Sequence, residues 1–315
     1  MPKRLSKPLN TYDKRKNKAI LYFSASSTGD FQQLYDFGIR ESLVSYFYIR
    51  KNFSYWDRML PIFKKEGGIF MTDSGAFSFM GKFSEDSEEY EKMKTEEFWL
   101  PYLNDYIKWI KDHKDYIFSV ANLDLDRIVG YEVVDKWNRE YFEPLEKEGI
   151  QVVYVAHEDA EGNHFMDRMK EYCQKYNYVG ANQTWKKFAS QIYQLVKQHK
   201  CRIHGFAWTE LALLKSYPFF SADSVTWLGG VRFGTTYDYD GKNFRTIDYK
   251  HKYRRKARKL KYVRAGVDYE EVQKETRINI NKMNLLGWLG FRKEYLKMAN
   301  LKLHTRTVDR YERKC

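Results

Sequence analysis

The sequence predicts an α/β fold in which eight parallel strands close into a (β/α)8, TIM-type barrel, followed by a basic C-terminal helical appendage. Two observations lead to this prediction. Short apolar, β-like runs alternate with longer amphipathic segments, and this order produces parallel sheets. Eight such runs occur between residues 19 and 225 of the 315-residue chain. Eight repeats of this kind predict closure into a barrel.

The β-like runs follow one another with helical segments between them. The runs are Ala19–Ser24, Leu43–Tyr48, Ile69–Asp73, Tyr116–Leu123, Gln151–Ala156, Tyr178–Ala181, Arg202–Phe206 and Phe219–Val225. The amphipathic segments include Glu89–Lys111, Tyr131–Lys147, His164–Lys175, Lys186–Gln198 and Thr209–Ser216. An open, doubly wound sheet is the main alternative, but it needs a glycine-rich phosphate turn after the first strand. The stretch Ser24-Ala-Ser-Ser-Thr-Gly29 is a poor match to such a turn.

The two ends of the chain depart from this alternation. Residues 1–18 are polar and basic and are predicted to form a flexible arm, so the barrel is expected to span residues 19–235 and the appendage residues 236–315. Within the appendage we expect a polar hairpin over Thr236–Tyr249, with Asp240-Gly241 at its turn. A dense basic run follows, and then two helical segments. These three parts are Lys250–Arg264, Tyr269–Asn281 and Asn284–Leu301.

The charge balance indicates the class of partner. Lys and Arg number 55 against 42 Asp and Glu, a net charge of +13, which attracts polyanions. Nucleic acid is therefore the expected partner, and a membrane surface is a distant second. No stretch approaches the roughly 18 apolar residues of a membrane span. The basic N-terminus lacks the apolar region of a secretory signal. Three scattered cysteines do not suit a disulfide framework or a cysteine-rich zinc site, so we expect a cytoplasmic protein.

Polar side chains gather where the predicted strands end. Reactive residues of such barrels lie at the carboxyl ends of the strands. Those ends hold Asp73, Asp124 or Asp126, His157, Asn182, Gly205 and Asp223. A single aspartate there is more often a helix cap or a loop residue. Carboxylates at the ends of three strands favour an active site, because a charged group at a strand end costs desolvation unless it has a partner or a task.

Two segments carry a more specific signal. One is Met71-Thr-Asp-Ser-Gly-Ala-Phe-Ser78, where small side chains after Asp73 would let a flat ligand approach the backbone. The other is the region His204–Gly234, which contains Gly205-Phe-Ala, Ala222-Asp-Ser-Val and Val231-Arg-Phe-Gly234. Together they resemble the Asp-Ser-Gly-Gly-Phe-Gln, Gly-Val-Gly, Phe-Asp-Cys-Val and Ala-Arg-Asn-Gly motifs of the tRNA-guanine transglycosylase superfamily. The resemblance covers roughly residues 60–235, and its middle part is weak.

The resemblance implies roles for individual residues. Asp223 would be the nucleophile and Asp73 the general acid/base. Asp124, with Asp126 as a competitor, and His157 would contact the base, and Gly180-Ala181 would lie under it. The expected base-binding residues are Ser74, Gly75, Asp124, Asp126, His157, Gly180, Ala181, Gly205 and Phe206. The expected nucleic-acid contacts are Arg232, Lys252, Arg254, Arg255, Lys256, Arg258 and Lys259.

The implied chemistry agrees with general principles of glycosyl transfer. A carboxylate attacks the anomeric carbon, and a second carboxyl group protonates the departing base. The sequence also departs from the tRNA enzymes. Only Cys315 follows residue 201, so the zinc site that they carry after the barrel cannot be built and no metal or other cofactor is expected. Ser78 replaces the final Gln of the first motif, which puts recognition of the modified base in doubt.

The short length and the basicity resemble the phage and bacterial DNA branch of the superfamily. That branch inserts 7-deazaguanine derivatives such as preQ0 into DNA, so a 7-deazaguanine base would be the co-substrate and the location would be the host cytoplasm for a phage protein. The run Lys250–Arg264 holds nine Lys and Arg in fifteen residues and favours phosphate contact over a merely solvated face. An enzyme acting on tRNA, a base-excising glycosylase and a non-catalytic binding barrel remain alternatives. Whether the protein forms a homodimer is left open, as is a functional or packing role for His204.

Overall fold

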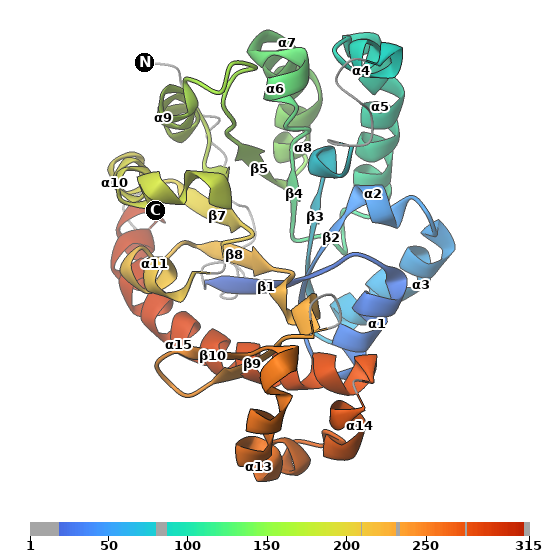
Figure 1. Ribbon diagram of the computed structural model, residues 1–315. Coiled ribbons are helices and arrows are strands. Elements are labelled where there is room, and N and C mark those ends of the chain that lie inside the picture. The colour runs from blue at the N-terminus through green and yellow to red at the C-terminus, as the bar shows by residue number, and fades with distance from the viewer. Residues whose placement is uncertain (1–18, 80–86, 209, 231–233, 275, 312–315) are drawn as a thin grey trace.

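The protein forms a closed barrel of eight parallel strands in the order β1 to β8, which confirms the predicted fold class (Figure 1). A computed structural model describes residues 19–79, 87–208, 210–230, 234–274 and 276–311. The predicted N-terminal arm at residues 1–18 and the predicted contact residue Arg232 lie outside these ranges. The strands are β1 (Ile20–Ala25), β2 (Glu41–Ser45), β3 (Ile69–Asp73), β4 (Ser119–Ala121), β5 (Gln151–Val155), β6 (Tyr178–Asn182), β7 (Arg202–Phe206) and β8 (Ser221–Ser224).

Helices connect successive strands and surround the barrel. They are α1 (Thr28–Asp36), α2 (Tyr46–Ile49), α3 (Phe53–Lys65), α4 (Glu88–Met93), α5 (Glu96–Asp112), α6 (Asp126–Val129), α7 (Tyr131–Trp137), η3 (Asn138–Phe142), α8 (Glu143–Lys147), α9 (Phe165–Lys175), α10 (Ala189–His199) and α11 (Leu211–Ser216). Short 3-10 turns are η2 (Ala76–Ser78), η4 (Gln183–Phe188) and η5 (Thr226–Leu228). The second strand ends earlier than predicted, because the Ser45 side chain caps α2 by accepting from the Phe47 amide.

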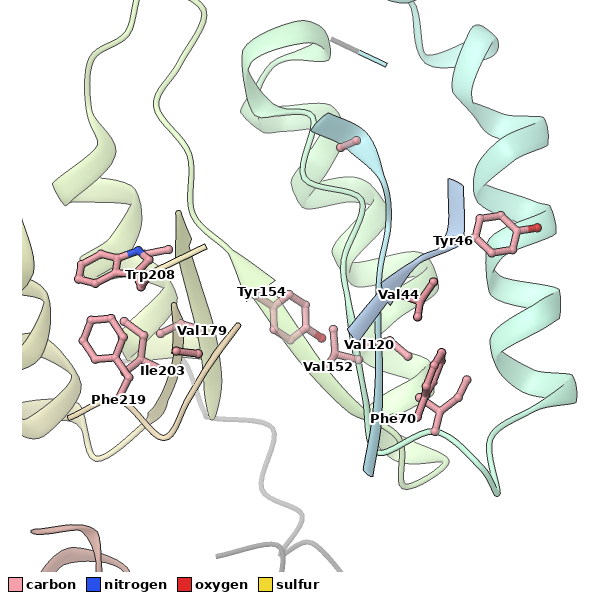
Figure 2. Packing of buried hydrophobic residues seen from close by; sticks show 14 of the residues in the cluster. Val44, Tyr46, Phe70, Val120, Val152, Tyr154, Val179, Ile203, Trp208 and Phe219 are labelled. Atoms are coloured by element: carbon pink, nitrogen blue, oxygen red, sulfur yellow. The ribbon is translucent and has the colours of Figure 1, made fainter. Parts of the chain in front are cut away.

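Alternation along the strands separates two buried layers. Outward-facing residues such as Val44, Phe70, Val120 and Val152 join one large cluster with the surrounding helices, and Figure 2 shows them lying between strands and helices. Inward-facing residues such as Tyr22 form a second cluster inside the barrel. The last inward position of each strand therefore faces the barrel mouth, which is where the candidate site lies.

The C-terminal region continues the barrel wall. The hairpin β9 (Thr236–Tyr239) and β10 (Phe244–Ile247) forms as predicted, with Gly241 at a φ of 98° in its turn. After η6 (Tyr249–Arg258), α13 (Lys259–Arg264) and α14 (Tyr269–Gln273), the long helix α15 (Arg277–Tyr311) runs back along the barrel (Figure 1). Its apolar side chains Leu285, Trp288, Phe291 and Tyr295 join the cluster between strands and helices.

Two polar contacts give the direction of α15. Arg277 at its start pairs with Asp30 beside the end of β1, and Tyr295 further along donates to the Phe219 carbonyl just before β8. The helix therefore runs antiparallel to the strands, as the other barrel helices do, and its start lies at the mouth. In the part of the chain that the structure describes, no helix is both long and apolar enough to cross a membrane.

Candidate active site at the barrel mouth

Asp223 lies on β8 with its side chain directed into the barrel mouth and is only 6% exposed. The Ser24 hydroxyl donates to its Oδ2 at 2.6 Å, and the Ala207 amide donates to its Oδ1 at 2.7 Å. Ala207 adopts a φ of 56°, a left-handed conformation that costs about 1 kcal/mol or more for a residue with a Cβ. Each oxygen of Asp223 is thus held by a hydrogen-bond donor.

Asp73 ends β3 in a different environment. Its Oδ1 accepts the Gly75 amide at 2.8 Å. Burial raises the pKa of this carboxyl group to about 7, and the charges of Asp124 and Asp223 add to the rise, whereas hydrogen bonds from Ser45 and Gly75 oppose it. A carboxyl group with a pKa near neutrality both donates and accepts a proton at physiological pH, as a general acid/base must.

Asp124 and His157 form a pair beside these two carboxyl groups. His157 Nε2 lies 2.8 Å from Asp124 Oδ2, and the Ser74 hydroxyl donates to Asp124 Oδ1 at 2.9 Å. Burial by itself would lower the pKa of His157, but the hydrogen bond and the negative charge of Asp124 outweigh it, so the net pKa is raised. The pair therefore places a hydrogen-bond acceptor, the Asp124 carboxylate, beside the His157 ring, which gains a proton readily.

Asn182 fixes the ring orientation of His157. The Thr184 amide donates to Asn182 Oδ1 at 2.9 Å, so the Nδ2 of Asn182 is the atom that faces His157 Nδ1, at 3.4 Å. An amide nitrogen can only donate. When the ring carries a single proton, Nδ1 therefore accepts from Asn182, and Nε2 carries the proton that faces Asp124. Asn182 is one of the polar residues predicted from the sequence to lie at the carboxyl ends of the strands.

Two predicted glycines are required by their surroundings. Gly75 has a φ of 78°, and a Cβ there would lie 2.5 Å from Ser45 Oγ and 2.6 Å from Phe47 Cβ. Inside the barrel, a Cβ on Gly180 would lie 2.8 Å from the Phe206 ring. Gly75 thus permits the tight turn that places its amide on Asp73, and Gly180 leaves room for Phe206 in the mouth.

Three predicted base-binding residues belong to the barrel wall, which corrects the sequence prediction. Asp126 is fully buried and bound by Arg168, whose Nη2 lies 2.9 Å from its Oδ1; this ion pair holds its side chain in the wall. Ala181 packs in the outer cluster. A Cβ on Gly205 would meet Phe219 and Trp208 at 2.8 Å, so Gly205 faces the helices and serves their close packing.

The basic run contains both structural and exposed cations. Arg255 is fully buried and donates to the Gly234 carbonyl at 3.1 Å, so its predicted nucleic-acid contact is wrong, because the guanidinium is enclosed within the appendage. Arg258 pairs with Asp238 at 3.0 Å, and Lys259 pairs with Glu270 at 2.7 Å. Exposed cations remain at Arg254 and Lys256, and Lys252 is half-buried.

The basic appendage is attached beside the mouth. Arg277 Nη2 lies 2.8 Å from Asp30 Oδ1, and Asp30 Oδ2 accepts from the Ser26 hydroxyl at 3.0 Å. Ser26 follows Ser24 by two residues, and Ser24 binds Asp223. A short chain of polar contacts therefore links the start of α15 to the end of β1 that supports Asp223.

Sequence reasoning did not assign Ser24, Ser45 or His204 to the site. Ser24 and Ser45 occupy the last inward positions of β1 and β2, and His204 occupies an inward position in the middle of β7, so the period-2 alternation was the available signal. The small hydroxyl side chains of Ser24 and Ser45 did not stand out from the many polar residues of the chain, and the role of His204 was left open between function and packing. Among the described residues, no group of three or more His, Cys, Asp or Glu side chains is arranged to hold a metal ion.

Fold and site together define a (β/α)8 barrel with an ionisable mouth. No family model and no curated protein matches the sequence. Among solved structures the chain is similar to tryptophan synthase from M. tuberculosis in its open form with BRD0059 bound. Identity is 11% and the TM-score 0.41, and the match covers 70% of this chain and 88% of that one. It is also similar to the Penicillium canescens endo-1,4-beta-xylanase XylE, with 8% identity, a TM-score of 0.39, and coverage of 67% and 83%.

Proposed function

We propose that this protein is a pentosyltransferase that exchanges guanine in DNA for a 7-deazaguanine base, such as preQ0 or a derivative, through a covalent glycosyl-aspartate intermediate. The observation that carries the proposal is the contrast between two carboxyl groups at one barrel mouth. Asp223 receives a donor on each oxygen, whereas Asp73 has a pKa raised to about 7 by burial and neighbouring charge. Two carboxyl groups in different environments take the roles of nucleophile and proton carrier.

The two carboxylate oxygens of Asp223 differ in how firmly their hydrogen-bond donors hold them. Oδ1 is held by a backbone amide, whereas among the described residues Oδ2 is held by the Ser24 hydroxyl, which turns about its own bond. In the proposed first step Oδ2 forms a bond to C1′ as the bond from C1′ to N9 of guanine breaks. The bonding electrons leave with the base, which takes a proton from Asp73.

The second step reverses these roles. The incoming 7-deazaguanine gives its N9 proton to the carboxylate of Asp73, and its N9 displaces Asp223 from C1′. The sugar is inverted twice, so its configuration is retained. A pKa near 7 suits Asp73 to both transfers, since similar populations of acid and base are present at neutral pH.

The remaining polar groups at the mouth suit a purine. Asp124 keeps lone pairs on both oxygens beyond those used by Ser74 and His157, and these can accept from the N1–H and amino group of guanine. His157 Nε2–H lies against the same carboxylate and can shift toward a carbonyl oxygen. Phe206, half-buried over Gly180, offers a flat apolar surface for a base.

The polymer is inferred from charge. The net charge of +13 and the exposed Arg254 and Lys256 favour a phosphate backbone, and the appendage that bears them joins the barrel beside the mouth. The target nucleotide must leave its stack to reach Asp223, because a base inside a duplex is inaccessible to side chains at the bottom of a barrel mouth.

Release of labelled guanine tests the proposal. Duplex DNA carrying labelled guanine is incubated with the protein in the presence and absence of preQ0, and tRNA is treated in parallel. Release from DNA that depends on the added base supports the proposal, and Asp223→Ala is expected to abolish release while DNA affinity stays nearly unchanged. Release from tRNA alone overturns the DNA assignment. Abasic sites without base insertion indicate a glycosylase, and binding without release indicates a non-catalytic barrel.

A further inference from the structure

A buried chain of polar side chains lies beneath Asp223 inside the barrel. His204 on β7 is fully buried, and its Nδ1 lies 2.6 Å from the Ser221 hydroxyl. The same hydroxyl lies 2.5 Å from the hydroxyl of Tyr178 on β6. On the other side of the ring, His204 Nε2 has no hydrogen-bond partner among the described residues and lies 3.4 Å from Asp223 Oδ1.

The unpartnered nitrogen calls for an explanation. A buried polar atom without a hydrogen bond destabilises the folded state, and such atoms are uncommon in folded proteins. Within the described part of the chain, the carboxylate that lies against His204 Nε2, at 3.4 Å, is that of Asp223, the proposed nucleophile. Contacts at active sites are often long before the substrate binds and shorten in the reacting complex.

The positions of the protons on His204, Ser221 and Tyr178 can be worked out by starting from Asp223. As the proposed nucleophile, Asp223 must be a carboxylate, which can only accept a hydrogen bond, so the nitrogen that faces it must carry a proton for the contact to be attractive. In a ring that carries a single proton, Nδ1 is then bare and accepts the Ser221 hydroxyl proton. Since Ser221 has only one proton, the Tyr178 hydroxyl must donate to Ser221 Oγ. Each hydrogen bond in the series from Tyr178 through Ser221 and His204 is therefore donated in the direction of Asp223.

We propose that His204 is a positioning residue that directs Nε2–H at Asp223 Oδ1, with its tautomer set by Ser221 and Tyr178. This proposal rests on the proposed role of Asp223 as nucleophile. The ring and the Ala207 amide would together hold Oδ1 and leave Oδ2 as the attacking oxygen. The same two donors would stabilise the negative charge that returns to Asp223 when the incoming base displaces it.

A pair of substitutions at His204 distinguishes the effect of losing the Nε2 hydrogen-bond donor from the effect of losing the volume of the ring. The side-chain amide of His204→Gln reaches the place of Nε2, whereas that of His204→Asn reaches only the place of Nδ1. A hydrogen bond to a charged group is worth about 1.5–3 kcal/mol, so at about 1.4 kcal/mol per tenfold change His204→Asn should slow formation of the covalent intermediate about 10- to 150-fold. His204→Gln should recover most of the rate, and both variants should have similar melting temperatures.

Nitrogen-15 NMR of the histidine rings gives a readout that needs no catalysis. The proposal predicts the Nε2–H tautomer for His204 in the wild-type protein, identified by loss of its signal in His204→Gln. Tyr178→Phe, which removes one hydroxyl, should weaken that preference. Finding the Nδ1–H tautomer in the wild type would overturn the proposed role of His204, and so would equal rate losses in the Asn and Gln variants. If the wild type forms no covalent intermediate, the proposed function fails. The tautomer alone then shows whether His204 directs its Nε2 proton at Asp223.

Discussion

Replacing Asp73 with asparagine should stabilise the folded protein at alkaline pH while removing the proposed base-exchange activity. Burial and the charges of Asp124 and Asp223 raise the pKa of this carboxyl group from 3.8 to about 7. The folded protein therefore keeps a proton that the unfolded chain releases between about pH 4 and pH 7. Through this window Asp73 makes stability fall as the pH rises, because the unfolded state binds fewer protons.

The magnitude follows from the same difference in pKa. At about 1.4 kcal/mol per pKa unit, the ionised carboxylate costs the folded state about 4 kcal/mol above pH 7. Asn keeps an oxygen that can accept the Gly75 amide and carries no charge. Asp73→Asn should thus raise the free energy of unfolding by up to about 4 kcal/mol at pH 8, and by under about 1 kcal/mol at pH 4, where the wild-type group is protonated.

Urea denaturation of both proteins from pH 4 to pH 9 measures this difference. Asp105→Asn is the matched control, because Asp105 is an exposed residue of α5, and it should show no comparable pH-dependent gain. A stability difference between Asp73→Asn and the wild type that is the same at pH 4 and pH 8 would refute the argument. So would a variant less stable than the wild type at pH 8.

Three further predictions concern the support of the site and of the appendage. Gly75→Ala should cost about 2–4 kcal/mol in urea denaturation, because the new Cβ meets Ser45 and Phe47 at a positive φ; an unchanged stability contradicts this reading. Arg168→Ala should cost about 3–5 kcal/mol, measured in the same way, since it leaves Asp126 buried without its partner. Lys256→Ala should keep the melting temperature and lower the salt dependence of DNA binding by about one ion, whereas Arg255→Ala should lower the melting temperature.

The strands could be predicted from the sequence because each combines an apolar run with a polar or turn-forming end. Element boundaries were less certain where the apolar signal continued. Tyr46-Phe-Tyr48 looks like the end of a strand, but the Ser45 hydroxyl caps a helix there. The predicted helix Glu89–Lys111 is divided into α4 and α5.

The site was only partly predictable, because side-chain direction depends on partners far away in the chain. Asp124 and Asp126 both follow β4 and differ by two positions, so the sequence could not separate them. Arg168, 42 residues after Asp126, holds one in the wall, and His157 pairs with the other. Arg255 likewise has the composition of a phosphate contact, but carbonyl groups of the appendage enclose it.

The most direct test of the account is mass-spectrometric mapping of the covalent intermediate. The protein is mixed with guanine-containing duplex DNA without added base, denatured in acid, digested with nuclease and protease, and searched for a peptide that carries a deoxyribosyl group. We expect one modified carboxylate, that of Asp223. Asp223→Asn should give no adduct, and the wild-type adduct should persist only until a 7-deazaguanine base is supplied. An adduct on another residue, or base exchange by Asp223→Asn, would contradict the account.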